Sequence, residues 1–102
     1  MKSFMEKINN HTFYVLECKD GSYYAGYTNN IERRLHMHNM GKGAKYTRGR
    51  GPVILLLAKE YDTKREAMQA EYQFKQLSRI EKELFIENER GSLNVATEKL
   101  SD

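Results

Sequence analysis

Two stretches near the start of the chain have the side-chain pattern of β-strands. Residues 12–18 (TFYVLEC) and 22–28 (SYYAGYT) are rich in aromatic and β-branched side chains and show no helical period. The residues between them, Lys19-Asp20-Gly21, are typical of a hairpin turn. The pattern therefore predicts a β-hairpin.

The length of this turn decides which side chains share a face of the hairpin. A two-residue loop would place Tyr14 and Tyr24 on opposite faces. A three-residue loop, with Gly21 in the left-handed conformation, pairs Cys18 with Ser22 and brings both tyrosines to one face. That face then holds four residues, namely Tyr14, Leu16, Tyr24 and Gly26. We predict the three-residue loop, because only this register lets both phenols serve a single site.

A short helix is predicted after the hairpin. Asn29 or Asn30 can cap its first turn, with Glu32 as part of a capping box. The helix covers about 31–39, and Gly41 ends it. Its inward stripe is formed by three residues: Ile31, Leu35 and His38.

A second helix has an acid on its apolar face. Thr63 and Glu66 have capping-box spacing and open this helix. Its core stripe consists of Ala67, Ala70, Phe74 and Leu77. Glu71 lies inside that stripe, where an unpaired carboxylate is costly to bury. The alternative to a functional role is an exposed position or a salt bridge to Arg34 or Lys75.

Two further elements are predicted in the second half of the chain. The continuous apolar run 52–59 (PVILLLAK) predicts a central strand buried on both faces. Ser78 and Glu81 repeat the capping box and open a helix that ends near Gly91. Its apolar positions are Ile80, Leu84 and Phe85 or Ile86. Residues 92–102 are polar, and we expect them to form a frayed tail.

The elements follow the order β-β-α-β-α-α, which predicts an α/β fold with helices packed on three strands. A chain of 102 residues is large enough for one domain and too small for two, and its core is expected over about 12–87. Hydrophobic residues are 39% and charged residues 30%, which is the composition of a globular chain.

Positive charge is concentrated in one stretch of the chain. Residues 33–50 hold six Lys or Arg residues and two histidines but no acid, in a chain of net charge +3. Such a stripe is typical of a polyanion partner, although a solvated lysine-rich loop would have the same composition. No apolar run approaches the ~20 residues of a membrane span, and residues 1–10 have no signal-peptide core. We expect a cytoplasmic protein whose lone Cys18 is a small buried hydrophobe.

These features together resemble the core of the GIY-YIG nuclease superfamily. The resemblance covers residues 12–87 and is carried by these positions: Tyr14, Tyr24-Ala25-Gly26, Arg34 and Glu71. More narrowly, the chain is similar to the small bacterial UPF0213 proteins. That similarity is carried by three segments: the turn 18–22 (CKDGS), the helical stretch 33–38 (RRLHMH) and the loop 41–47 (GKGAKYT).

The resemblance implies a small three-stranded, largely antiparallel sheet flanked by helices, and metal-dependent hydrolysis of phosphodiester bonds. The family's two motif tyrosines fall on Tyr14 and Tyr24, and its glycine falls on Gly26. Its helix arginine falls on Arg34 and its metal-binding glutamate on Glu71.

Four positions depart from the family pattern. Thr12-Phe13 replaces Gly-Ile in the first motif, and Ala25 replaces a larger aliphatic residue in the second. These changes concern packing, because neither position supplies a reacting group. Tyr27 stands where some relatives have a lysine, which leaves the identity of the general base open.

Phosphodiester hydrolysis requires an activated water, a neutralised phosphate and a stabilised leaving oxygen. One ion held by Glu71 can polarise the phosphate, and a single carboxylate with waters suits Mg²⁺ or Mn²⁺ better than zinc. Arg34 can grip two phosphate oxygens in its planar fork. Tyr24 can orient or deprotonate the water, and Tyr14 can position the phosphate. His38 is expected to carry a proton or to donate to phosphate.

The glycine-rich loop 41–51 is the predicted surface for tracking a nucleic-acid strand. Its contact residues are Lys42, Lys45, Tyr46, Arg48 and Arg50. No base-reading helix is present in the pattern, so we expect little sequence specificity, and DNA rather than RNA as the partner. We expect no membrane contact and no small-molecule cofactor.

The predicted function is that of a DNA endonuclease in DNA repair or processing. The first alternative is a non-catalytic nucleic-acid-binding module of the same fold. The second is a protein-interaction domain in which the basic loop is incidental.

Overall fold

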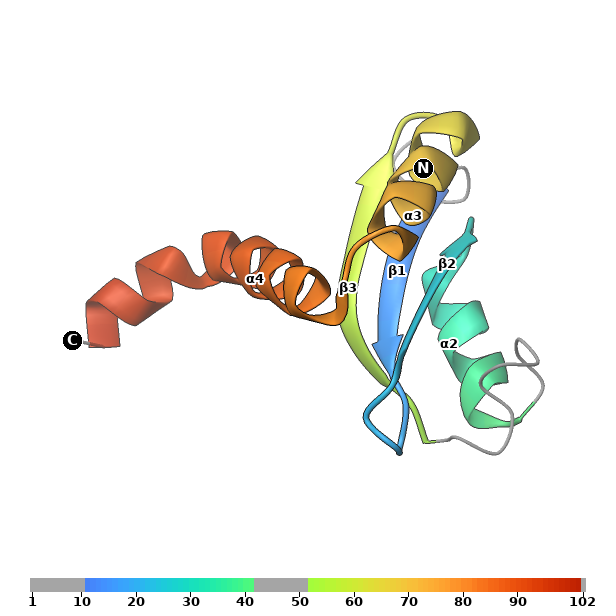
Figure 1. Ribbon diagram of the computed structural model, residues 1–102, viewed down its shortest axis with the longest axis horizontal. Coiled ribbons are helices and arrows are strands. Elements are labelled where there is room, and N and C mark those ends of the chain that lie inside the picture. Colours follow the sequence, from blue (N-terminus) through green and yellow to red (C-terminus); the bar gives the residue numbers. More distant parts are fainter. Residues whose placement is uncertain (1–10, 42–51, 102) are drawn as a thin grey trace, which may run out of the picture.

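The computed structural model describes the backbone of residues 11–41 and 52–101 and the side chains of residues 11–41 and 52–91. Six elements follow one another in the predicted order (Figure 1). They are β1 (His11–Glu17), β2 (Tyr23–Thr28), α2 (Ile31–Asn39), β3 (Ile54–Tyr61), α3 (Lys64–Lys75) and α4 (Arg79–Ser101). Within the described backbone, none of the helices combines the length and the apolar character that a bilayer span requires.

The hairpin between β1 and β2 has the predicted three-residue loop. Gly21 is left-handed, with φ of 86°, and its N–H donates to the Cys18 carbonyl at 2.8 Å. The Cys18 N–H donates to the Ser22 carbonyl, also at 2.8 Å. The strands then pair so that Tyr14 lies opposite Gly26. This register, set by the glycine in the turn, decides which side chains meet further along the strands.

The sheet is antiparallel, with the strand order β2-β1-β3. The prediction of 52–59 as the central strand is wrong, because β1 lies in the centre and β3 lies at an edge. The apolar run of β3 has another cause. Val15 pairs with Leu57, and Leu16 pairs with Leu55. Leu56 is therefore left without a partner residue on β1, which makes it the bulged residue of β3. Leu56 and Leu57 pack on one face of the sheet, and Leu55 packs on the other.

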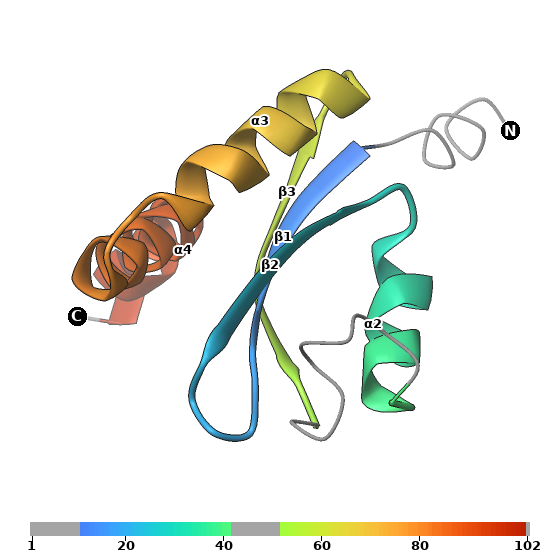
Figure 2. The same ribbon diagram turned by 45° about the vertical axis from the view of Figure 1, so that its right-hand side comes forward.

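Helices cover both faces of the sheet, which gives two separate cores (Figure 2). On one face α3 and α4 pack over a core that includes Phe13, Val15 and Phe74. On the other face α2 packs over a core that includes Tyr14 and Leu16. Adjacent residues of β1 therefore point into different cores, as the two-residue period of a strand requires. Tyr14 faces α2.

Side-chain caps begin the helices as predicted. Asn30, rather than Asn29, caps α2, and its Oδ1 accepts from the Arg33 N–H at 3.1 Å. Thr63 caps α3 by accepting from the Glu66 N–H at 3.1 Å. Before α4, the Glu81 Oε1 accepts from the Ser78 N–H at 2.8 Å, and the Ser78 Oγ accepts from the Glu81 N–H at 3.2 Å. The starts of the three helices are therefore set by residues close together in the sequence.

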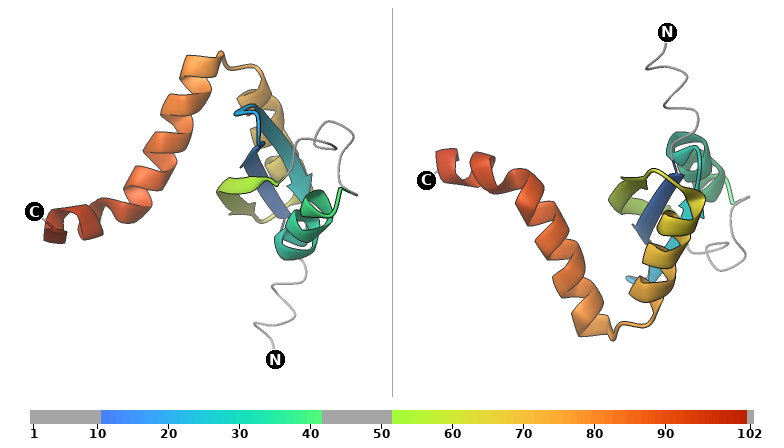
Figure 3. Two further views of the ribbon diagram at one scale, coloured as in Figure 1. Left: turned by 90° about the horizontal axis from the view of Figure 1, so that it is seen from below. Right: turned by 90° about the horizontal axis from the view of Figure 1, so that it is seen from above.

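The predicted end of α4 near Gly91 is wrong, since the helix continues to Ser101 (Figure 3). A glycine ends a helix when it adopts the left-handed conformation, as Gly41 does after α2 with φ of 78°. Gly91 has no positive φ. In α4, Ile86 is buried, whereas Ile80 and Leu84 are 69% and 59% exposed, because the helix projects from the body of the protein.

Candidate active site

Tyr14 is the centre of the candidate site. It lies on the central strand, and its side chain is 1% exposed. Two residues of α2 reach its hydroxyl: the Nε2 atom of His38 at 3.1 Å and the Nε atom of Arg34 at 3.4 Å. These contacts follow from the helical spacing, because residues four apart project from one face of α2.

The hydrogen bonds at Tyr14 join two side chains of α2. The guanidinium of Arg34 can only donate, so the Tyr14 hydroxyl accepts from Arg34; the direction of its bond to His38 Nε2 depends on the tautomer of His38. His38 is 1% exposed; this burial lowers its pKa, and the charge of Arg34 lowers it further. His38 is therefore neutral near pH 7.

Electrostatics keep Tyr14 protonated. Burial raises the pKa of Tyr14 to about 12, against a lowering effect of the hydrogen bond from Arg34. Smaller contributions that raise this pKa come from Tyr24 and from the charge of Glu71. A phenol with this pKa is a poor base at neutral pH, so Tyr14 is suited to orienting its neighbours.

Tyr24 and Gly26 complete the face of the hairpin that carries Tyr14. The ring centroid of Tyr24 lies 6.2 Å from that of Tyr14 and 5.4 Å from that of His38. The ring of Tyr14 crosses Gly26 so closely that a Cβ atom there would lie 2.6 Å from the Tyr14 oxygen. A glycine is therefore required at position 26 for this arrangement of the two rings.

Arg34 is half-buried beside both phenols. Its pKa is raised, first by the hydrogen bond to Tyr14 and to a smaller extent by interactions that include Tyr24. The guanidinium is thus held at the edge of the aromatic cluster and remains charged. A fixed, partly solvated guanidinium of this kind can bind an oxyanion.

Glu71 lies on α3, across the sheet from α2. Its side chain is 17% exposed, and its Oε2 accepts from the Lys75 Nζ at 2.6 Å. The ion pair with Lys75 was one of the alternatives open from sequence. Glu71 is electrostatically coupled to Tyr14, because its charge contributes to the raised pKa of that phenol.

The predicted residues are therefore brought together to different degrees. Tyr14, Tyr24, Arg34 and His38 form one contact cluster between the hairpin and α2. Glu71 lies in the other helical layer, where it pairs with Lys75, and its charge makes a small contribution to the raised pKa of Tyr14. The loop residues Lys42, Lys45, Tyr46, Arg48 and Arg50 lie outside the part of the chain that the structure describes.

The donor set for a metal ion is small. Among residues 11–41 and 52–91, no three His, Cys, Asp or Glu side chains gather closely enough to hold an ion together. Glu71 offers one partly exposed carboxylate. One hard oxygen ligand fits a hydrated Mg²⁺ or Mn²⁺ ion, which keeps most of its waters, and does not fit structural zinc.

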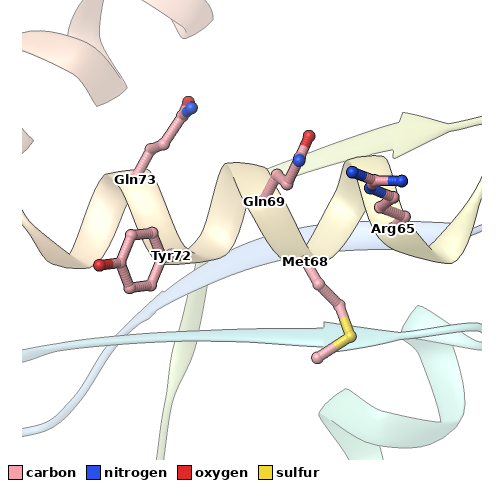
Figure 4. A pocket seen from close by; sticks show the side chains of 5 residues that line it. All are labelled: Arg65, Met68, Gln69, Tyr72 and Gln73. Carbon is pink, nitrogen blue, oxygen red and sulfur yellow. The ribbon is translucent and has the colours of Figure 1, made fainter.

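Two hollows lie along α3. The smaller, of about 340 Å³, borders the candidate site and is lined by Tyr23, Tyr24, Ala25, Phe74, Lys75 and Lys82. The larger, of about 520 Å³, is lined by Arg65, Met68, Gln69, Tyr72 and Gln73. Figure 4 shows that its lining comes from a single helix, with Gln69 and Gln73 extending to one side and Met68 to the other. The larger hollow is lined by none of the predicted site residues, whereas the smaller one is lined by Tyr24. The smaller hollow is therefore the one that adjoins the candidate site.

Sequence reasoning missed the lysine of α4 and the first tyrosine of β2 in this smaller hollow. Lys82 and Tyr23 are far apart in the chain, and they line one hollow because the first turn of α4 lies beside the hairpin, where Arg79 donates to the Gly21 carbonyl. The sequence signal for this region was the i, i+4 spacing of Glu71 and Lys75, which indicates their ion pair but not the hollow.

Known proteins share both the sequence and the fold. Residues 10–83 match the family described as the GIY-YIG catalytic domain. The UPF0213 protein YazA of Bacillus subtilis (strain 168) is 62% identical over 84 residues, which are 82% of this chain and 85% of YazA. A UPF0213 protein of Bacillus cereus is 60% identical over 97 residues, which are 95% of this chain and 98% of that protein.

Two solution NMR structures have the same fold. The UPF0213 protein BH0048 from Bacillus halodurans has a TM-score of 0.51 at 55% identity, covering 76% of this chain and 82% of that chain. The protein EF2693 from E. faecalis has a TM-score of 0.56 at 48% identity, covering 79% and 86%.

The matched domain and the shared fold define a nuclease-type protein. The chain belongs to the GIY-YIG family and, within it, to the UPF0213 proteins.

Proposed function

We propose that this protein is a metal-dependent DNA endonuclease of low sequence specificity that acts in DNA repair or processing. The observation that carries the proposal is the hydrogen-bonded group of Tyr14, His38 and Arg34, with Tyr24 packed beside it. A cluster that served only to pack the core would not require a charged guanidinium beside two phenols at a partly solvated edge.

Each side chain has a distinct role in this proposal. Arg34 binds the oxygens of the scissile phosphate and neutralises charge that develops in the transition state. Tyr14 orients Arg34, because its hydroxyl is already engaged by Arg34 and His38. Tyr24 orients the attacking water or accepts its proton. Neutral His38 is hydrogen-bonded to the Tyr14 hydroxyl and serves as a proton carrier.

Glu71 is the proposed ligand of one Mg²⁺ or Mn²⁺ ion. Such an ion, when bound, acts as a Lewis acid on a phosphate oxygen and lowers the pKa of bound water. Lys75 now holds the same carboxylate oxygen, so it competes with the cation for Glu71.

The basic loop is the proposed strand-tracking surface. If three or four of Lys42, Lys45, Arg48 and Arg50 contact phosphates, log affinity falls against log salt concentration with a slope of about −3. The ring of Tyr46 is proposed to stack on a base or a sugar.

Purified protein tests the proposal on branched, nicked, single-stranded and duplex DNA with Mg²⁺, Mn²⁺ or EDTA. We expect metal-dependent cleavage that Glu71→Gln and Arg34→Ala reduce by at least about 100-fold. Glu71→Gln should keep DNA binding. Lys59→Gln is the matched control, since Lys59 forms an ion pair with Glu89 and lies on β3, the edge strand on the opposite side of the sheet from β2.

The alternative is a non-catalytic nucleic-acid-binding module. The ion pair between Glu71 and Lys75 favours it, because a carboxylate neutralised in this way has no need of a metal ion. Salt-sensitive binding of all four DNA forms without cleavage would establish the module and overturn the nuclease proposal.

A further inference from the structure

A hollow that shares Tyr24 with the candidate active site lies between β2, α3 and α4. Resting on the proposed function, we propose that the 340 Å³ hollow between β2, α3 and α4 holds the nucleotide next to the phosphate bound by Arg34. We call this hollow the β2-edge groove. It is lined by Tyr23, Tyr24, Ala25, Phe74, Lys75 and Lys82.

The β2-edge groove has the size and the floor that a nucleotide requires. Its volume is at the lower end of the range for small-ligand sites, which begins near 300 Å³. Ala25 and Phe74 form a buried apolar floor, and the half-buried ring of Tyr23 provides an aromatic wall. An aromatic wall over an apolar floor binds the face of a base without reading its sequence.

Cations surround this aromatic lining. The Lys82 Nζ lies 5.6 Å from the ring centroid of Phe74. The guanidinium carbon of Arg79 lies 3.8 Å from the ring centroid of Tyr23, and its Nη1 donates to the Gly21 carbonyl at 3.0 Å. Lys75 adds a third positive charge at the groove.

Carboxylates also lie at this edge: Glu17 acts on Arg79 through its charge, and two others form ion pairs. Glu71 holds Lys75 at 2.6 Å, and Glu83 holds Arg79 at 3.0 Å. Lys82 is thus the cation of this edge that is best placed to bind an incoming phosphate. The combination of stacking surface and phosphate-binding cation is specific to nucleotides among small anions.

The β2-edge groove and the candidate active site lie on opposite faces of the sheet and share one residue. Tyr24 belongs to both, since it lines the groove and packs against Tyr14 and His38. β2 is an edge strand, so a nucleic-acid strand can pass over it from one helical layer to the other. A phosphate at Arg34 would then place its neighbouring nucleotide over Tyr24 and into the groove.

Binding measurements in EDTA test this inference without any requirement for catalysis. A fluorescein-labelled single-stranded 12-mer is titrated by anisotropy over a salt series, together with a matched 12-mer of abasic sugars. We expect Lys82→Gln to weaken binding of both oligonucleotides and to reduce the salt slope by about 0.7. Lys82→Glu should weaken binding further.

The aromatic wall is tested by Tyr23→Leu, which keeps an apolar side chain. We expect this variant to bind the normal 12-mer about fivefold or more weakly and to bind the abasic 12-mer like wild type. Lys59→Gln is the control, because the Nζ of Lys59 also lies over an aromatic ring, that of Tyr61 at 6.0 Å, on the strand at the opposite edge. Thermal melting verifies that each variant is folded.

The possible failures are distinguishable. If wild type binds but Lys82→Gln and Tyr23→Leu match Lys59→Gln, the β2-edge groove is not a nucleotide site and the proposed function stands. If wild type binds neither DNA nor RNA in a salt-sensitive way, both the groove and the proposed function are overturned.

Discussion

At the scale of single residues, the site depends on one buried hydroxyl. Tyr14 accepts a hydrogen bond from the guanidinium of Arg34 and is hydrogen-bonded to the imidazole of His38, so it fixes two side chains of α2 at once. Neither partner would be held in place by helical propensity alone. The chemistry of the site therefore depends on the protonation and the position of this phenol.

Tyr14→Phe tests this role. It keeps the ring in the core but removes a partner from buried His38, so we expect a loss of about 1–2 kcal/mol in the free energy of unfolding. Urea denaturation measures the loss, and activity assays should show a fall in kcat. Tyr27→Phe is the matched control, since its hydroxyl lies 2.7 Å from the Nδ1 atom of His11, away from α2. Equal losses in both variants would contradict a special role for Tyr14.

Gly26→Ala tests the close approach of Tyr14 to the backbone. The added methyl group would lie 2.6 Å from the Tyr14 oxygen, so we expect destabilisation by about 1–3 kcal/mol. In Gly91→Ala the methyl group meets no atom within 4 Å, and the same change in a helix should stabilise by about 1 kcal/mol at most. Thermal unfolding of both variants should show opposite shifts; a neutral Gly26→Ala contradicts the packing.

His38 makes stability depend on pH. Burial lowers the pKa of His38 in the folded protein. As the pH falls below the ordinary value of about 6.5, the unfolded chain therefore binds more protons at this residue than the folded protein does. Stability contributed by neutral His38 is present above that pH and is lost below it. Urea midpoints at pH 7.5 and 5.5 should differ more for wild type than for His38→Gln. Identical pH dependence in the two proteins would exclude His38 as the titrating group.

At the scale of elements, two helices on opposite faces present charged groups to one strand edge. α2 supplies Arg34, and α3 supplies Glu71 with its partner Lys75. The charge of Glu71 makes a small contribution to the raised pKa of Tyr14, which lies on the central strand between the two helical layers.

The ion pair within α3 leads to a prediction about metal affinity. Lys75→Gln removes the cation that holds Glu71, so we expect Mn²⁺ to bind about two- to fivefold more tightly, the effect of a partly exposed ion pair. Electron paramagnetic resonance of free Mn²⁺ measures this without DNA. Lys59→Gln should leave the affinity unchanged, and Glu71→Gln should abolish the effect. Unchanged affinity in Lys75→Gln would show that Glu71 does not hold the ion.

At the scale of the whole molecule, the core under α3 and α4 supports the site from behind. The ring of Phe74 packs against those of Phe13 and Phe85, with centroids 5.6 and 5.7 Å apart. Phe74, on α3, thus contacts both the central strand β1 and the helix α4. The same ring forms the floor of the β2-edge groove.

Truncation of this shared ring should affect the whole fold. Phe74→Ala is expected to cost about 3–5 kcal/mol, since Phe74 is only 3% exposed. Tyr72→Ala, two residues away and 65% exposed in wild type, should change stability by about 0.5 kcal/mol or less. Chemical denaturation of the pair gives the comparison. Similar costs for the two variants would contradict the assigned core.

The sequence by itself determined the local structure of this protein. The glycine of the hairpin turn fixed the register that brings Tyr14 and Tyr24 to one face, and side-chain caps fixed the starts of the helices. These features are local, because each depends on residues a few positions apart. The contacts of the hairpin with α2 join residues 20 and 24 positions apart, and the resemblance to the GIY-YIG family, rather than local structure, predicted that group.

Only the tertiary structure decided the strand order, the end of α4 and the surroundings of Glu71. The apolar run of β3 reflects two covered faces and a bulge, which sequence cannot distinguish from a central position. Glu71 pairs with Lys75 on the opposite layer from Arg34, and the β2-edge groove joins residues of three elements. Such arrangements depend on how separate elements pack, and hydrophobic periodicity carries no information on that.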